Sequence, residues 1–431
     1  MTVLHAASQT AIDQAAPLNV DVAYERSRRA ALTESVIGPV GLEIESHLVD
    51  LDAVGKAVSW DRVERMQDIV GPVQRHSKVS LEPGGQLELS GHPEPAIASA
   101  IARLRHDMMG TRLALADLRL GVAFVGADPL RPSRRINPRP RYQAMEQHFA
   151  ATGRAEPGAV MMNSTAAMQV NLQAGPEREW SSRVARAYRL GPVLVAISAS
   201  SPWLHGRDTG WKSVRQRAWS RLDPRCCGPV PGCMAPDAAA AGALDPASAW
   251  ARYALAAPVA FVRTGGDQAM SVRASIPFEQ WANGTVRLGG RLPTAADLDV
   301  HLTTLFPPVR LRGYLELRYL DMTAPRWWPA IAAVATTLMD DPVAADQMTQ
   351  ATEQTVALWT TAARQGLGNV VLAEAARRCL AIAAERVPAE LGSAVADLAE
   401  LVESGRCPGD LLAQRISEIG PRAAFEELAH A

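Results

Sequence analysis

Four stretches of this sequence place acidic or amide side chains at every second position, with apolar residues between them. They are residues 42–45 (LEIE), 86–90 (QLELS), 168–173 (MQVNLQ) and 315–319 (LELRY). Successive side chains of a β-strand point to opposite faces, so each stretch predicts a strand with one polar and one apolar face. A half-solvated strand gives the same alternation. The repetition of acids and amides, with one arginine and no lysine or threonine on these faces, favours a shared concave surface that gathers metal ions.

The polar positions of these stretches, and of the Pro-Gly-Gly bend before the second one, offer oxygen ligands. The candidates are Glu43, Glu45, Glu82, Glu88, Glu316, Gln169 and Asn171. Carboxylate and carbonyl oxygens without cysteine or histidine suit Mg²⁺, Mn²⁺ or Ca²⁺. Residues i and i+2 of a strand lie about 6.5–7 Å apart, and paired Mg²⁺ ions lie about 3.5–4 Å apart. Glu43 and Glu45 could therefore bind neighbouring metal ions.

Five carboxylates on one surface repel one another strongly where the effective dielectric constant is low. They are tolerated there when cations lie between them or when some of them are protonated. Such a cluster beside an arginine is suited to phosphoryl transfer, because metal ions and guanidinium groups neutralise charge on phosphate oxygens. The alternative is that these acids belong to separate salt bridges without a common site.

The elements that must position these residues are both strands and helices. Strands are expected at residues 41–48, 86–90, 122–126, 165–173 and 311–320, and helices at residues 60–69, 95–117, 142–150, 177–198 and 296–304. The residues from Trp327 onward have helical spacing of apolar positions. We expect an N-terminal arm (1–35), a catalytic sheet-and-helix domain (36–330) and a helical C-terminal layer (331–431) packed on the same domain.

Composition predicts a cytoplasmic protein that binds neither nucleic acid nor membrane. The chain has 431 residues, 48% hydrophobic and 21% charged, and its formal net charge of -1 gives no general attraction to polyanions. Residues 1–30 show no signal peptide, and the most apolar run, 331–339, is too short to span a bilayer. Five cysteines form no C-x-x-C pair, which favours free thiols in a reducing compartment.

Known phosphate-binding and hydrolytic motifs are absent from the sequence. It has no G-x-x-x-x-G-K-[ST] loop, no G-x-G-x-x-G after a strand, no H-E-x-x-H and no G-x-S-x-G. A basic, proline-rich loop at residues 131–141 (RPSRRINPRPR) has two interpretations: contact with a nucleotide phosphate, or a loop that faces water.

Five motifs resemble those of one known family, the plant- and proteobacterial-type glutamate–cysteine ligases. They are residues 81–91 (LEPGGQLELSG), 168–172 (MQVNL), 213–219 (SVRQRAW), 253–255 (YAL) and 301–318 (HLTTLFPPVRLRGYLELR). The match is closest to the actinobacterial branch that makes γ-glutamylcysteine for ergothioneine. The PGGQ and LTTLFP stretches are the specific signals.

This resemblance implies an α+β, glutamine-synthetase-like fold, in which a curved, mainly antiparallel sheet forms an active-site funnel and is backed by helices. It also implies the substrates and cofactors, which are L-glutamate, L-cysteine, ATP and Mg²⁺. ATP phosphorylates the γ-carboxylate of L-glutamate, and the amine of L-cysteine then displaces phosphate from the γ-glutamyl phosphate.

The resemblance also assigns roles by position. Metal ligation is implied for Glu43, Glu45, Glu82, Glu88 and Glu316, and ATP binding for Gln169, Asn171 and Arg318. Arg215 matches the arginine that grips a glutamate carboxylate, which suits bidentate pairing. Arg318 and Glu316 are the implied catalytic residues. The sequence departs from the plant pattern at residues 319–322 and around Cys226-Cys227, so plant-style thiol regulation is not implied.

Other functions remain open from the residues. One is a ligase that joins glutamate to a different amine. A second is a guanidino kinase, which can share a related sheet but transfers phosphate to a guanidine. A third is a non-enzymatic helical scaffold built on residues 327–431.

Overall fold

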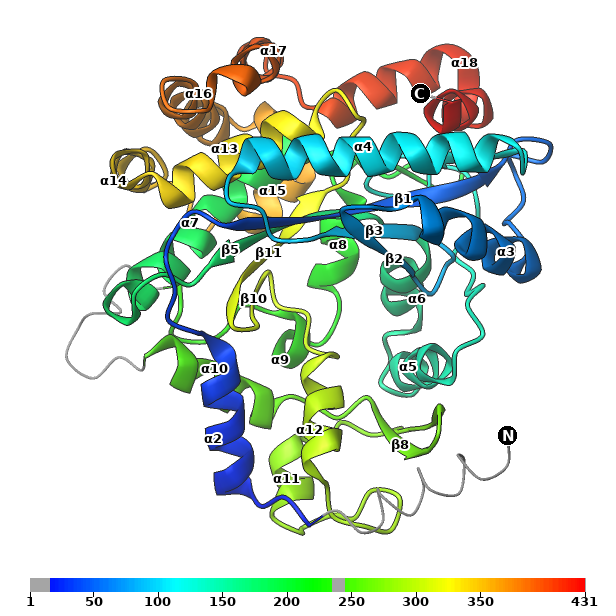
Figure 1. Cartoon of the computed structure of the whole chain (residues 1–431), viewed down its shortest axis with the longest axis vertical. Coiled ribbons are helices and arrows are strands. Elements are labelled where there is room, and N and C mark those ends of the chain that lie inside the picture. Colours follow the sequence, from blue (N-terminus) through cyan, green and yellow to red (C-terminus); the bar gives the residue numbers. More distant parts are fainter. Residues whose placement is uncertain (1–15, 235–244, 431) are drawn as a thin grey trace.

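The computed structural model describes residues 16–234 and 245–430 and contains a seven-stranded, antiparallel sheet (Figure 1). Its strands follow the order β10-β11-β5-β1-β3-β2, and β4 pairs with β1. The bounds are β1 Val40–Asp50, β2 Ser77–Leu81, β3 Leu87–Gly91, β4 Leu120–Ala123, β5 Ala167–Gln173, β10 Val309–Leu311 and β11 Tyr314–Asp321. Segments far apart in the sequence therefore meet at the centre of the sheet.

The strand register places the alternating stretches on a common polar face. Glu43 lies opposite Gln169, and Glu45 lies opposite Glu88. Directly opposed residues project to the same side of a sheet, and Glu316 on β11 lies opposite Asn171 on β5. The predicted convergence of these side chains on one face is what the register produces.

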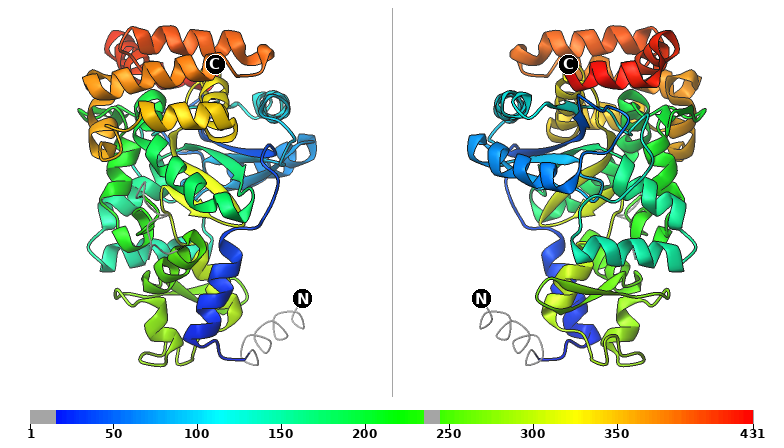
Figure 2. Two further views of the ribbon diagram at one scale, coloured as in Figure 1. Left: turned by 90° about the vertical axis from the view of Figure 1, so that its left-hand side faces the viewer. Right: turned by 90° about the vertical axis from the view of Figure 1, so that its right-hand side faces the viewer.

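Helices cover the apolar face of the sheet. α4 (Ile97–Ala116) packs on β1 and β3, α7 (Trp180–Ser198) on β11, and α13 (Trp328–Asp340) on β5. Residues 328–339 of α13 are all buried, so this helix is the centre of the main hydrophobic core. Helices α14 (Pro342–Ala351), α16 (Val370–Ala384) and α17 (Gly392–Glu403) pack on α13 toward the top of the molecule (Figure 2). Helix α15 (Trp359–Gln365) packs on α7 and α8 (Val214–Ser220), and α18 (Pro408–His430) packs on β4.

A lower lobe faces the polar side of the sheet (Figure 1). It contains α2 (Val20–Ala31), α5 (Pro140–Ala151), α10 (Pro246–Ala256), α11 (Phe278–Ala282), α12 (Ala295–Leu302) and the hairpin of β8 (Phe261–Gly265) and β9 (Gln268–Ser271). A second hydrophobic cluster, which includes Phe278, Trp281 and Leu298, holds most of this lobe together, while α5 packs in the main core through Met145 and Phe149. Helices α6 (Ala155–Ser164) and α8 (Val214–Ser220) run between the lobe and the sheet (Figure 1).

The expected strands and helices are present, with ends that differ by a few residues. Residues 1–35 were expected to contain a loose arm and one helix. A helix of this region, α2, packs on α10, and residues 1–15 lie outside the described residues. The division into arm, catalytic domain and C-terminal layer stays a prediction. Within residues 16–234 and 245–430, no helix combines the length and the apolar composition needed to cross a membrane.

Candidate active site

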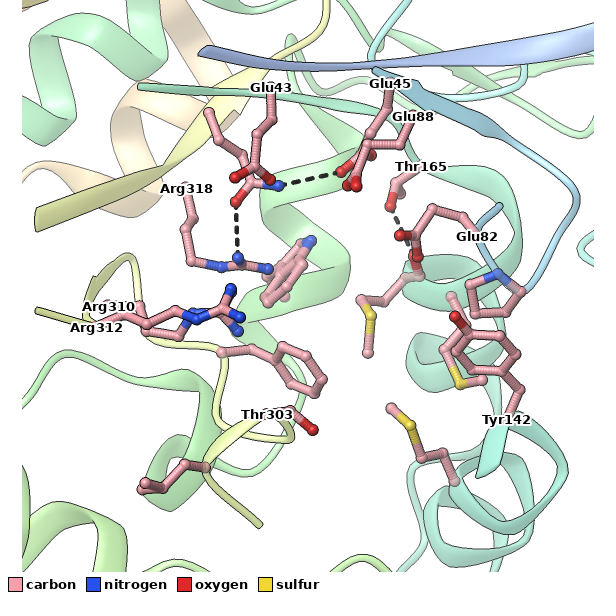
Figure 3. A pocket seen from close by; sticks show the side chains of 18 of the residues that line it. Glu43, Glu45, Glu82, Glu88, Tyr142, Thr165, Thr303, Arg310, Arg312 and Arg318 are labelled. Atoms are coloured by element: carbon pink, nitrogen blue, oxygen red, sulfur yellow. Dashed lines mark hydrogen bonds between the residues drawn. The ribbon is translucent and has the colours of Figure 1, made fainter. Parts of the chain in front are cut away.

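A cavity of about 610 Å³ lies between the polar face of the sheet and the lower lobe (Figure 3). Seven of the nine residues predicted from the sequence line it: Glu43, Glu45, Glu82, Glu88, Gln169, Arg215 and Arg318. The other two, Asn171 and Glu316, lie behind this lining and contact it. The carboxylates therefore converge as the alternating pattern predicted.

Glu43 and Glu45 project from the middle of β1 into the cavity (Figure 3). Asn171 Nδ2 donates to Glu43 at 2.9 Å, and the Ala167 backbone N–H donates to Glu45 at 2.7 Å. Burial raises the pKa of both carboxyls to about 7, and the nearby Glu88 carboxylate adds to the shift. Their charged forms are costly here without a cation.

Glu88 and Glu82 extend the row of carboxylates along β3 and the bend before it. Glu88 accepts hydrogen bonds from Ser80 Oγ at 2.6 Å and Ser90 Oγ at 2.9 Å, which fix the position of its carboxylate. Glu82 opens the bend, in which the Gly85 N–H donates to the Glu82 carbonyl oxygen at 3.0 Å. Burial raises the pKa of Glu82 well above its ordinary value, and Glu88 and Glu45 raise it further.

The Pro-Gly-Gly sequence of this bend has a steric reason. A Cβ atom on Gly84 would lie 2.3 Å from the carbonyl oxygen of Asn163, so only glycine allows the bend to approach α6 this closely. Gly85 has a φ of +83°, a left-handed conformation that favours glycine. The two glycines together direct Glu82 into the cavity.

Glu316 is fully buried on β11 and is paired with two arginines. Arg310 on β10 makes a bidentate contact with it, and Arg318 Nη1 lies 3.2 Å from its Oε1. Although burial alone raises the pKa of Glu316, the two guanidinium groups outweigh it and lower the pKa to about 2. Both of its oxygens are engaged by arginine, so direct metal ligation by Glu316 stays a prediction that requires these pairs to rearrange.

Arg318 is held in place from several sides. Its Nη1 donates to Gln169 Oε1 at 2.7 Å (Figure 3), and its guanidinium lies 6.0 Å and 5.9 Å from the ring centroids of Trp219 and Phe306. Gln169 in turn reaches Glu45 at 3.5 Å. A positive charge is therefore fixed opposite the row of carboxylates, as a site for phosphate oxygens requires.

Arg215 lies on α8 and is 2% exposed. Its Nη2 donates to the Arg318 carbonyl oxygen at 2.6 Å, while Nη1 is buried without a hydrogen-bond partner and lies 3.9 Å from Asp321. Burial lowers the pKa of Arg215, although Asp321 and Glu45 counteract it. Because Arg215 lines the cavity, its positive charge can attract a carboxylate ligand there.

The sequence interpretation assigned no role to several residues of the cavity wall, namely Tyr142, Trp219, Phe306, Arg310 and Arg312. The basic loop 131–141 turns out to have mixed roles. Arg131 pairs with Asp128, Arg135 pairs with Glu146, and only Arg141 of this loop's arginines lines the cavity. The signal for Arg310 and Arg312 was present as a further alternation, VRLR, at residues 309–312.

The donor set of the cavity fits Mg²⁺, because it consists of carboxylate oxygens. Burial raises the pKa values of Glu43, Glu45 and Glu82, so a cation would stabilise their charged forms. Among the described residues, the one group of three acidic, histidine or cysteine ligands within 4.8 Å of one another is His76, His106 and Asp107, away from this cavity. The four glutamates are thus spread more widely than a single metal shell.

Comparison with known proteins identifies relatives along nearly the whole chain. The model of "Glutamate-cysteine ligase family 2 (GCS2)" matches residues 39–429. Glutamate–cysteine ligase EgtA of Mycolicibacterium smegmatis is 48% identical over 399 residues, which cover 93% of this chain and 92% of the relative. Glutamate–cysteine ligase EgtA of Mycobacterium tuberculosis is 46% identical over 431 residues, 99% of this chain and 98% of the relative.

A solved structure agrees with the fold. The glutamate–cysteine ligase of Francisella tularensis in complex with AMP superposes with a TM-score of 0.55 at 12% identity, over 92% of this chain and 88% of the other. The predicted α+β, glutamine-synthetase-like fold is confirmed. From the extent of the family match and the near full-length relatives, the chain belongs to glutamate–cysteine ligase family 2.

Proposed function

We propose that the protein is an ATP-dependent glutamate–cysteine ligase that makes γ-glutamylcysteine for ergothioneine biosynthesis. The observation that carries this proposal is the cavity itself, where Glu43, Glu45, Glu82 and Glu88 line one wall and Arg318 faces them. This arrangement can hold a nucleotide triphosphate through metal ions on one side and a guanidinium on the other. Membership of the family adds independent support.

Glu43, Glu45, Glu82 and Glu88 would hold Mg²⁺ in the cavity, with Glu316 as a further predicted ligand. When bound, Mg²⁺ neutralises charge on the phosphates of ATP and on the transferred phosphoryl group. Glu43, Glu45 and Glu82 need such a cation, because burial and mutual repulsion raise their pKa values.

The arginines and amides of the site have separate proposed roles in binding the substrates. Arg215, which lines the cavity, binds a carboxylate of L-glutamate. Arg318, oriented by Gln169, stabilises the phosphoryl group while it is transferred from ATP to L-glutamate. Asn171 holds Glu43 through its Nδ2 and acts on ATP only indirectly in this structure, since it does not line the cavity.

The reaction requires activation because a carboxylate is a poor electrophile. An oxygen of the L-glutamate γ-carboxylate attacks the γ-phosphorus of ATP, the bond to ADP breaks, and γ-glutamyl phosphate forms. The nitrogen lone pair of L-cysteine then forms the amide bond as the C–O bond to phosphate breaks. Of the two protons that the ammonium loses, one leaves with phosphate and one passes to solvent.

The test measures release of ADP and phosphate with each amino acid alone and with both. We expect phosphate release that depends on both amino acids and on Mg²⁺, with γ-glutamylcysteine detected by mass spectrometry. Hydroxylamine should trap γ-glutamyl phosphate as a hydroxamate, which a guanidino kinase does not give. Turnover that ignores cysteine, or that prefers another amine in competition, would contradict the assignment.

We also propose that the enzyme acts in the cytoplasm without nucleic-acid or membrane partners. All five cysteines are free and buried, which suits a reducing compartment. The formal net charge of -1 provides no general attraction to polyanionic surfaces. Fractionation of cells that express the tagged protein, with a membrane and a nucleic-acid fraction, tests this point.

A further inference from the structure

Three side chains that commonly bind metal ions meet where α4 passes the start of strand β2. They are His76, directly before β2, and the neighbouring residues His106 and Asp107 of α4. One possible ligand atom of each lies within 4.8 Å of those of the other two. We name this group the His76 cluster. Because α4 covers the apolar face of the sheet (Figure 1), the cluster is separate from the carboxylates on the polar face.

Asp107 is fully buried, and its carboxylate is held in one orientation. Its Oδ2 accepts hydrogen bonds from the His76 backbone N–H at 2.9 Å and from Ser77 Oγ at 2.7 Å. Its Oδ1 accepts one longer bond, from the Arg75 N–H at 3.3 Å. Carboxylates that bind metal ions are usually oriented by such outer hydrogen bonds. Since a carboxylate oxygen has two lone pairs, Oδ1 can still bind a cation.

The two imidazoles of the cluster are accessible. His76 is half-buried and His106 is exposed, and their rings meet edge to face with centroids 5.6 Å apart. Within residues 16–234 and 245–430, neither imidazole makes a hydrogen bond or an ion pair through its ring nitrogens. Both rings can therefore offer a nitrogen to an ion that arrives from solvent.

The ligand types select the ion. Two imidazole nitrogens and one carboxylate oxygen suit Zn²⁺, Co²⁺, Ni²⁺ or Cu²⁺, whereas Mg²⁺ prefers oxygen ligands alone. Zinc sites that keep an open position use three protein ligands and a water molecule, at about 2.0–2.2 Å from the ion. The ligand atoms must move closer together to reach these distances, and a rotation of the exposed His106 side chain can achieve this.

We propose that the His76 cluster binds Zn²⁺, or a transition-metal ion of similar preference, and thereby fastens the start of β2 to α4. Strand β2 is the last strand in the sheet order and pairs with β3, so an added tie to α4 would limit opening at this edge. Ser80 of β2 donates to Glu88, which links the fastened strand to a carboxylate of the cavity. The proposal does not depend on the proposed function, because its readouts need no substrate.

Zinc titration of the full-length protein tests the site. The protein competes with a chromophoric chelator for Zn²⁺ in excess Mg²⁺, which occupies the carboxylates of the cavity. We expect the wild-type protein to bind one equivalent of Zn²⁺, and His106→Ala to lower the affinity about tenfold or more. His106 is exposed and alanine favours helices, so this variant should fold, and thermal unfolding without metal checks that it does.

The matched control is His430→Ala, which removes an exposed helical histidine outside the cluster. It should keep the wild-type affinity for Zn²⁺. Hydrogen exchange then measures the tie between the two elements. Zn²⁺ should slow exchange of the β2 amides in the wild-type protein and in His430→Ala, but not in His106→Ala.

Two outcomes would overturn the metal site: no Zn²⁺ binding by the wild-type protein in excess Mg²⁺, or full affinity retained by His106→Ala. If Zn²⁺ binds but exchange in β2 stays unchanged, the ion does not fasten the strand and that part of the proposal is wrong.

Discussion

At the scale of single residues, Glu316 shows how a predicted ligand can have a different role in the observed geometry. It neutralises Arg310 and Arg318 from within the sheet, and its oxygens are occupied by them. Glu316→Gln keeps the shape but leaves two guanidinium groups without their counterion. Breaking a buried pair costs about 3–5 kcal/mol, and loss of a preorganised electrostatic group lowers kcat about 10²-fold or more.

Urea unfolding and steady-state kinetics measure these two effects of Glu316→Gln. The pKa of Glu316 is lowered to about 2, so the stabilisation it provides is present above pH 4.5 and lost as the pH falls toward 2. The variant should therefore lack this part of the acid transition. A kcat within about threefold of wild type would refute a catalytic role.

Arg215 tests the recognition of glutamate. Arg215→Lys keeps a positive charge but loses the planar pair of donors, so the KM for L-glutamate should rise about tenfold with little change for ATP. The neighbouring Asp321 keeps hydrogen bonds from the Ser200 N–H and from the Ser201 and Ser213 hydroxyls, so the fold should tolerate the change. If the KM for ATP rises instead, Arg215 belongs to the nucleotide site.

Glu43 and Glu45 make the stability of the protein depend on pH in the direction opposite to that of Glu316. Their pKa values are raised to about 7, so the unliganded protein is stabilised by their protonated forms at low pH and loses that contribution as the pH rises through 7. Mg²⁺ needs the deprotonated carboxylates, so its affinity should increase over the same interval.

Thermal unfolding between pH 5 and pH 8, with and without Mg²⁺, measures this dependence. We expect Mg²⁺ to raise the Tm more at pH 8 than at pH 5, and the double variant Glu43→Gln/Glu45→Gln to lose most of that difference. An equal Mg²⁺ effect at both pH values in the wild-type protein would contradict metal binding by these two carboxylates.

At the scale of elements, local periodicity predicted the strands, because the alternation of apolar and polar residues is visible in the sequence itself. It could not predict the Arg310–Glu316 pair, which depends on the register between β10 and β11. Helix α6 was also missed. Its first turn contains Pro157 and Gly158, which normally indicate a loop, and the helix forms because a proline near the start is tolerated.

The bend before β3 supports a prediction at this scale. Gly84→Ala places a methyl group 2.3 Å from the Asn163 carbonyl oxygen, so the bend must shift and carry Glu82 with it. We expect a loss of about 1–3 kcal/mol in stability and weaker Mg²⁺-dependent activity. Gly71→Ala, where nothing lies within 4 Å, is the control and should stay within about 1 kcal/mol of wild type. Equal stability and activity of Gly84→Ala and Gly71→Ala would refute the steric explanation of the bend.

At the scale of the whole molecule, the cavity lies between the sheet and the lower lobe. The main hydrophobic core lies behind the sheet and also reaches α5 and α10, and a smaller core lies within the lobe. The cavity wall includes Glu43 and Arg318 of the sheet. It also includes Tyr142 and Thr303 of the lobe, so ligands bound in the cavity contact both the sheet and the lobe. No local pattern in the sequence predicts such a division, because it results from how distant segments pack.

Ligands that bind only the folded protein stabilise it, by about 2.7 kcal/mol at a concentration of 100 Kd. Because the smaller core should open more readily, the unliganded lower lobe should exchange its amide hydrogens faster than the sheet does. A non-hydrolysable ATP analogue with Mg²⁺ and L-glutamate should slow exchange in α5 and α12, whereas α17, which lies far from the cavity, should stay unchanged (Figure 1). Slowing confined to the sheet would show that the ligands do not connect the two cores, and the lobe would then have no part in binding.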